Sequence, residues 1–169
     1  MREETEGKTG KPTPTRNKPV RPRDLLGRPL PWEAENELTL EDFDSLSTDE
    51  NHRLGVAHFD AGRFFPAHEA WETAWKQARD TDDAELFKGL SQLGAGWVHL
   101  ARGNRHGAVT LLERARSRIS AYPEGTLGLD TAAIAHGCAE AIAAVGRGEL
   151  VPGEPIPEGL LPSVSYPGV

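Results

Sequence analysis

Apolar side chains recur every three or four residues through the middle of the chain, a spacing that places them on one face of an α-helix. The clearest case is 83–102, where four leucines and Trp97 fall on a single stripe before Gly103 and Asn104 end the pattern. Convincing strand alternation is absent. The pattern predicts five helices, at about 48–61, 66–79, 83–102, 105–121 and 131–145.

Capping and breaking residues set the expected helix ends. Thr48 is the expected cap of the first helix, and Pro66 is the expected first residue of the second, because proline is favoured in a first turn. Pro123 ends the fourth helix. Short connections at Gly62 and Gly103 should fold helices one and two, and helices three and four, into antiparallel hairpins.

The two hairpins share a weak internal repeat. After each hairpin glycine the spacings of the matched residues are identical, whereas before it they differ by two, so the leucines give a slightly shorter period than the alanines. The matched residues are Leu54-Gly55, His58, Gly62, Ala67, Trp71 and Ala74 in the first hairpin, and Leu93-Gly94, Trp97, Gly103, Ala108, Leu112 and Ala115 in the second.

This alternation of large and small residues resembles that of tetratricopeptide hairpins, although any close crossing of two helices also needs small residues. Both explanations predict the same core, built from the leucine stripe with Phe64, Trp71, Trp75 and Trp97. We therefore expect an all-α fold: a compact bundle of two antiparallel helical hairpins, tetratricopeptide-like, plus a fifth C-terminal helix that caps them.

Both ends of the chain are rich in proline and poor in large apolar side chains. We expect 1–31 to be a mostly disordered basic arm, although an extended segment within it can be held on the body by Leu25, Leu26, Leu30 and Trp32. Beyond the arm, the expected divisions are an extended lead-in at 32–47, a helical domain at 48–146 and a Pro-rich irregular tail at 147–169.

Charge and composition narrow the classes of function. The net charge is −7, but 1–31 carries eight Lys or Arg and four acids, whereas 32–169 carries eleven and twenty-two. An acidic body repels phosphate backbones, which argues against nucleic-acid binding. There is no apolar run of about 18 residues to span a bilayer, no apolar N-terminal signal segment, and a single cysteine, Cys138. We expect a cytoplasmic protein without a membrane segment, with a protein partner or a homodimer on its Trp-rich face.

Polar residues gather on two of the expected helices. His68 and Glu72 are four residues apart, so their side chains stack at the border of the apolar face, while Glu69 lies further toward solvent. Gln92 and His99 line the side of the next helix opposite its leucines. If the second helix packs on that side, His68, Glu72, Gln92 and His99 meet in a half-buried cluster.

Three interpretations of this cluster stay open. The side chains can satisfy one another's hydrogen bonds and fix the helix register. They can form a divalent metal site with His68, Glu72 and His99 as ligands and Glu69 as the candidate catalytic base, because His68-Glu69-x-x-Glu72 is one substitution from the zinc-protease motif His-Glu-x-x-His. They can also line a groove for a small molecule or peptide beside the tryptophans. A binding module is the expected function, and a metal-dependent hydrolase is the alternative.

Three motifs in order carry a family resemblance. Ala67-His68-Glu69-x-x-Glu72-x-x-Trp75, Gly89-Leu90-x-Gln92, and Arg102-Gly103-Asn104 followed by Gly107-Ala108 are similar to the bacterial family called domain of unknown function 309. The resemblance covers roughly 54–116 and implies an all-helical fold. It also implies that the characteristic positions are His68, Glu69, Glu72, Trp75, Gln92 and Asn104. It brings no activity, substrate or cofactor.

Overall fold

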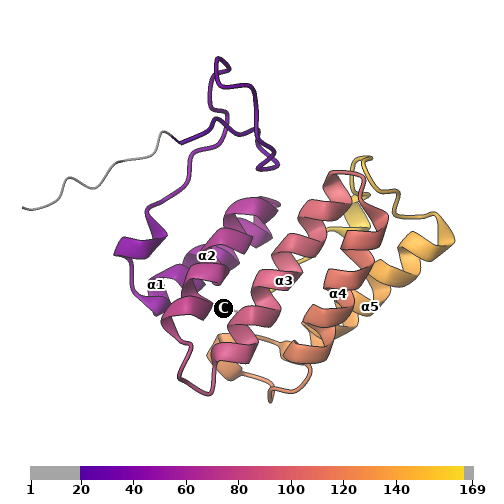
Figure 1. The fold of residues 1–169 in the computed structure, drawn as a ribbon. Helices are drawn as coiled ribbons and strands as arrows, with labels where there is room; N and C mark the ends of the chain where they lie inside the picture. Colours follow the sequence, from indigo (N-terminus) through magenta and orange to yellow (C-terminus); the bar gives the residue numbers. More distant parts are fainter. Residues whose placement is uncertain (1–19, 166–169) are drawn as a thin grey trace, which may run out of the picture.

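The computed structural model describes residues 20–165, and within them every regular element is helical, as predicted. The α-helices pack side by side in chain order (Figure 1), each against the next. None of them is both long and apolar enough to cross a membrane. They are α1 (Thr48–Asp60), α2 (Phe64–Gln77), α3 (Ala84–Ala101), α4 (Arg105–Ile119) and α5 (Thr131–Arg147), with 3-10 turns η1 (Phe43–Ser45), η2 (Thr126–Gly128) and η3 (Glu158–Leu160).

Two helix starts differ from the prediction. The cap of α1 is Ser47 and not Thr48: Ser47 Oγ accepts the Glu50 N–H at 3.1 Å, and the Glu50 carboxylate accepts the Ser47 N–H at 2.8 Å. This reciprocal pair satisfies two N–H groups that the first turn leaves free. Helix α2 begins at Phe64 and not at Pro66. Pro66 still lies in the first turn, where its missing N–H costs nothing.

The structure aligns the two hairpins with one common period. A Cβ on Gly55 would lie 2.5 Å from the Trp71 ring, and a Cβ on Gly96 would lie 2.9 Å from the Leu112 side chain. Both glycines precede their contact by the same spacing along the chain, so Gly96, and not Gly94, is the counterpart of Gly55. In each hairpin the missing side chain lets the second helix press a large residue onto the first.

The hairpin corners repeat with the same period. His58 Nδ1 accepts a hydrogen bond from Arg63 Nε at 2.9 Å, and His99 Nδ1 lies 2.9 Å from the Asn104 side-chain nitrogen. In both corners the backbone N–H of the fifth residue also donates to the histidine carbonyl at 2.8 Å. His99 is therefore the counterpart of His58, in the place that the sequence comparison gave to Trp97.

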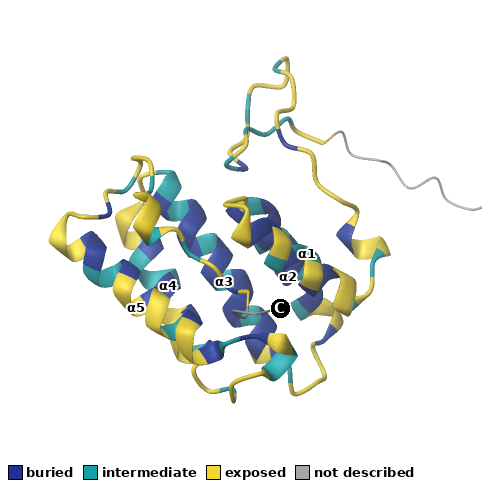
Figure 2. Cartoon of the chain, turned by 180° about the vertical axis from the view of Figure 1, so that it is seen from behind, coloured by how far each residue is buried: buried dark blue, intermediate teal, exposed yellow. Residues whose placement is uncertain are grey.

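Helix α5 continues the pattern as the first helix of a third repeat. Gly137 follows Gly96 at the same interval at which Gly96 follows Gly55, but nothing comes within 4 Å of a Cβ built on it. Among the described residues no further α-helix follows α5. The side of α5 that would pack against such a helix carries exposed residues (Figure 2), and residues 159–164 of the C-terminal tail line a pocket there with Gly137.

The core lies between the helices and is formed mainly by the expected residues. Trp71 is completely buried, and Phe64, Trp97 and the α3 leucines are nearly so. Trp75 is the exception, because it is only partly buried at the edge of this core. Its ring lies beneath the Lys88 ammonium at 5.3 Å and the Arg79 guanidinium at 5.7 Å, so its outer face is covered by cationic side chains and not by a helix.

The chain beyond α5 returns across the helices to α1 (Figure 2). Val164 is buried, and its N–H donates to Asp60 Oδ1 at 2.8 Å, while Ser163 Oγ donates to the same oxygen at 3.1 Å. Proline-rich as expected, this irregular tail still contributes apolar side chains to the core. It links the last helix to the first.

A loop at 21–38, the N-terminal strap, lies over the ends of α2 and α3 (Figure 1). The backbone N–H groups of Leu30 and Glu37 donate to Pro22 and Arg23 carbonyls, which closes the loop on itself. Of the four residues expected to hold this segment, Leu25 and Trp32 are exposed, at 69% and 56%. The strap is held instead by Arg102, which donates to the Leu26 carbonyl, and by the packing of Gly27 on the Phe65 ring. The remainder of the arm, 1–19, lies outside the described residues.

Candidate functional site

Three side chains of α2 converge on its solvent-facing edge. His68 Nε2 lies 3.4 Å from a Glu72 carboxylate oxygen and 4.0 Å from one of Glu69. One ligand atom of each residue lies within 4.8 Å of the other two. The side chains are 24%, 34% and 35% exposed for His68, Glu72 and Glu69, so Glu69 is no closer to solvent than Glu72. The three can close on a single cation.

Helix α3 fixes the orientation of the His68 ring. His68 Nδ1 lies 2.9 Å from the backbone carbonyl oxygen of Ser91, and Ser91 Oγ is 3.0 Å from the same nitrogen. A carbonyl oxygen only accepts hydrogen bonds, so Nδ1 carries the ring proton. Nε2 then faces the two carboxylates. Metal-binding histidines commonly donate their second ring nitrogen to a carbonyl or carboxylate in this way.

Gly94 allows α3 to come close enough for this contact. A Cβ at Gly94 would lie 3.0 Å from the backbone of His68 and 3.1 Å from its Cβ. Only a residue without a side chain lets the two backbones approach so closely. Helix α2 therefore supplies the side chains of the site, and the close packing of α3 on it fixes the orientation of the His68 ring.

Of the predicted cluster of His68, Glu72, Gln92 and His99, the structure pairs His68 with Glu72 and gives Gln92 and His99 other hydrogen-bond partners. Gln92 faces α4, where its Oε1 accepts from Arg118 Nη1 at 3.2 Å. Asn104 caps α4 by accepting the Gly107 N–H through Oδ1 at 3.0 Å, so its amide nitrogen donates to His99 Nδ1 at 2.9 Å. His99 therefore belongs to the hairpin corner and carries its proton on Nε2, and Glu69 is the third member of the group on α2.

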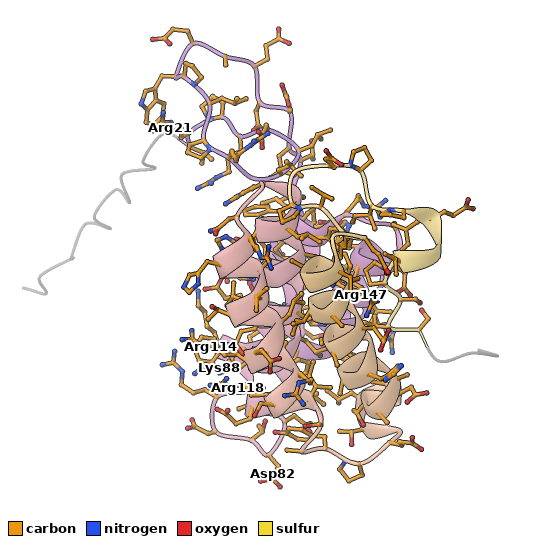
Figure 3. The ribbon with its side chains drawn as sticks, turned by 90° about the vertical axis from the view of Figure 1, so that its right-hand side faces the viewer. Arg21, Asp82, Lys88, Arg114, Arg118 and Arg147 are labelled. Atoms are coloured by element: carbon orange, nitrogen blue, oxygen red, sulfur yellow. The ribbon has the colours of Figure 1, made fainter. Side chains whose placement is uncertain are left out.

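The surroundings of the site are basic. Lys76 Nζ lies 3.4 Å from Glu72, and Lys88 covers Trp75 one turn further along α2. Side chains of Lys88, Arg114 and Arg118 project from one side of the molecule, away from Arg147 (Figure 3). Burial and the positive charge of Arg102 lower the pKa of His99, with a smaller contribution from His68. Glu72 is thus paired with a lysine of its own helix.

Two buried histidines are structural, although the sequence offered no partner for either. His52 Nδ1 accepts from Trp71 Nε1 at 3.2 Å, and its Nε2 donates to the Leu127 carbonyl at 3.0 Å. His58 Nε2 lies 2.9 and 3.1 Å from the two carboxylate oxygens of Glu41. These partners lie 17 to 75 residues away in irregular or neighbouring elements, so no local spacing could indicate them.

These features define an all-helical protein with a His–Glu–Glu group on its second helix, held in place by the third. Residues 52–111 match the sequence model of the family described as Domain of unknown function (DUF309), in agreement with the resemblance seen in the motifs. The match runs from within α1 to the middle of α4 and contains the whole candidate site. Searches of curated proteins and of solved structures found no match.

Proposed function

We propose that the protein binds a divalent transition-metal ion through His68 Nε2 and the carboxylates of Glu69 and Glu72. The observation that carries this proposal is the His68 ring, whose Nδ1–H donates to the Ser91 carbonyl and whose Nε2 faces both carboxylates. With Nδ1 held by α3, Nε2 remains for a ligand, and a carboxylate oxygen of each glutamate lies within 4.0 Å of it. Two negative charges beside it favour a cation.

The donor set indicates the class of metal. One imidazole nitrogen and two carboxylates suit zinc, iron or manganese, whereas calcium and magnesium prefer oxygen ligands throughout. Three protein ligands on an open helix edge leave further coordination positions for water or for an anionic group. The Lys76 ammonium, 3.4 Å from Glu72, is compatible with such a group.

A binding function is favoured over the hydrolase alternative because of where Glu69 and His99 lie. The hydrolase required His99 as the third ligand and left Glu69 free as the base. Asn104 holds the Nδ1 of His99, and Glu69 lies within the ligand group itself. A single carboxylate does not serve well both as metal ligand and as general base.

Metal titration of the untagged, chelator-treated protein tests this proposal. We expect one Co²⁺ or Zn²⁺ per chain, measured by cobalt absorption and by calorimetry, and at least tenfold weaker binding in His68→Gln and Glu72→Gln. His136→Gln is the matched control, because His136 is exposed on α5. Absence of stoichiometric metal binding, or equal affinity in His68→Gln and His136→Gln, contradicts the proposal.

A further inference from the structure

We propose that the cavity between the N-terminal strap and the corner of α1 and α2 binds a small apolar monocarboxylate. This cavity, the strap cavity, has none of the proposed metal ligands in its lining, and the proposal does not depend on metal binding. Its volume of about 450 Å³ falls in the range of ligand-binding pockets, about 300–1,000 Å³.

The walls of the strap cavity are mostly apolar. Leu38, Phe64 and Val98 are each at least nine-tenths buried, so part of the lining belongs to the core of the protein. A ligand that enters gains apolar burial against walls that are already in place. The lining residues are Leu25, Leu26, Leu38, Thr39, His58, Gly62, Arg63, Phe64, Phe65, Pro66 and Val98.

The strap forms a fixed wall of this cavity. Arg102, on the end of α3, donates to the Leu26 carbonyl through Nη2 at 2.7 Å and Nε at 3.2 Å. Gly27 lies against the Phe65 ring so closely that a Cβ would be 2.3 Å from it, and its φ of +74° also favours glycine. Arg23 holds the same turn by donating to the Gly27 carbonyl at 2.6 Å. The cavity is thus preformed, which reduces the entropic cost of binding.

A guanidinium at the edge of the cavity gives it a preference for anions. Arg63 Nε donates to His58 Nδ1, which fixes the group and leaves its terminal nitrogens available. His58 in turn donates to Glu41 through Nε2, so the Glu41 carboxylate is held on the histidine and not on Arg63. Within residues 20–165, no ion pair includes Arg63. The fork of N–H donors in arginine matches a carboxylate well.

The electrostatic surroundings support the same choice of ligand. The guanidiniums of Arg23 and Arg102 lie 5.9 and 6.0 Å from the Phe65 ring that lines the cavity. Arg63 is the only arginine or lysine in the lining, which suits a head group with one negative charge. The volume corresponds to about fifteen water molecules, so the ligand has about ten to fifteen non-hydrogen atoms.

Octanoate, 1-octanol and octylammonium are the probes for this proposal, titrated into the full chain and followed by amide NMR shifts. We expect octanoate to shift the amides of Leu26, Thr39 and Gly62 and to bind at least tenfold more tightly than either other probe. Arg63→Gln should abolish this preference, whereas Arg114→Gln, a change at an exposed arginine of α4, should keep it.

A second variant keeps the test decisive if Arg63→Gln fails to fold. Thr39 is exposed and lines the cavity, so Thr39→Phe fills the space without disturbing the core and should abolish octanoate binding. Three results overturn the proposal: no octanoate binding at millimolar concentration, equal binding of all three probes, or octanoate binding that survives both Thr39→Phe and Arg63→Gln.

Discussion

Gly55 and Gly137 occupy the same position of the repeat but have opposite surroundings, and this difference predicts opposite effects of one substitution. In Gly55→Ala the new methyl group would lie 2.5 Å from Trp71 Cε2 and Nε1. Trp71 has no exposed surface and is held by its hydrogen bond to His52. It therefore moves only by disturbing the core and that bond. In Gly137→Ala the methyl group meets nothing within 4 Å.

The two magnitudes follow from these contacts. Overpacking a core costs about 1–3 kcal/mol, and leaving the buried His52 Nδ1 unpaired costs a further ~1–3 kcal/mol. Replacing glycine by alanine inside a helix returns about 0.5–1 kcal/mol. We expect Gly55→Ala to lower the free energy of unfolding by about 2–4 kcal/mol. Gly137→Ala keeps only the helix gain and should raise that free energy by about 0.5–1 kcal/mol.

Thermal and urea unfolding, followed by circular dichroism, measure both effects. For a chain of this size, 1 kcal/mol corresponds to about 2–4 °C in Tm. Gly55→Ala should therefore melt at least about 4 °C below the wild type, and Gly137→Ala slightly above it. The reasoning is refuted if Gly55→Ala has the wild-type Tm, or if both substitutions shift Tm in the same direction.

Three further predictions concern titratable side chains. Burial lowers the pKa of His52, and protonation would remove the acceptor of Trp71, so stability should be constant above about pH 6.5 and fall below it by up to ~1.4 kcal/mol per pH unit. His52→Gln should flatten that slope in urea unfolding between pH 5 and 6.5, and an unchanged slope contradicts the assignment. Lys76→Gln should tighten metal binding up to about fivefold, because it frees Glu72 from an exposed ion pair worth at most ~1 kcal/mol, and weaker binding would contradict this. Burial raises the pKa of Cys138 to about 12, so iodoacetamide at pH 8 should label it only after unfolding, and rapid labelling of the native protein contradicts its burial.

The helices could be predicted because the residues that determine each helix lie close together in the sequence. A helical period of apolar residues, together with Pro and Gly at the breaks, located all five helices to within a turn at either end. Their caps were less certain, since Ser47 and Thr48 are both good cap residues and only the reciprocal bond with Glu50 distinguishes them. The pairing of His68 with Glu72 was also local, because it depends only on the four-residue spacing within one helix.

Which side chains pair between two helices depends on how each helix is rotated about its own axis. The sequence does not specify that rotation. A shift of one residue turns a helical position by about 100°, and that shift separates Ser91, which holds His68, from Gln92, which faces α4. Because α3 packs against helices on both sides, its polar residues could face either neighbour. The pairing of His58 with Glu41 is a harder case, since an irregular segment supplies the partner and periodicity carries no information about it.

The return of the C-terminal tail to α1 has a consequence for how the molecule unfolds. In a linear array of hairpins each helix contacts only its neighbours, so the ends fray independently and the array unfolds in pieces. Here Val164 bonds to Asp60 across 104 residues of chain. Unfolding of α1 or of the C-terminal tail must first break this link. The link therefore couples the two ends of the helical array and makes unfolding more cooperative. The same link closes a long loop during folding, so it should form late.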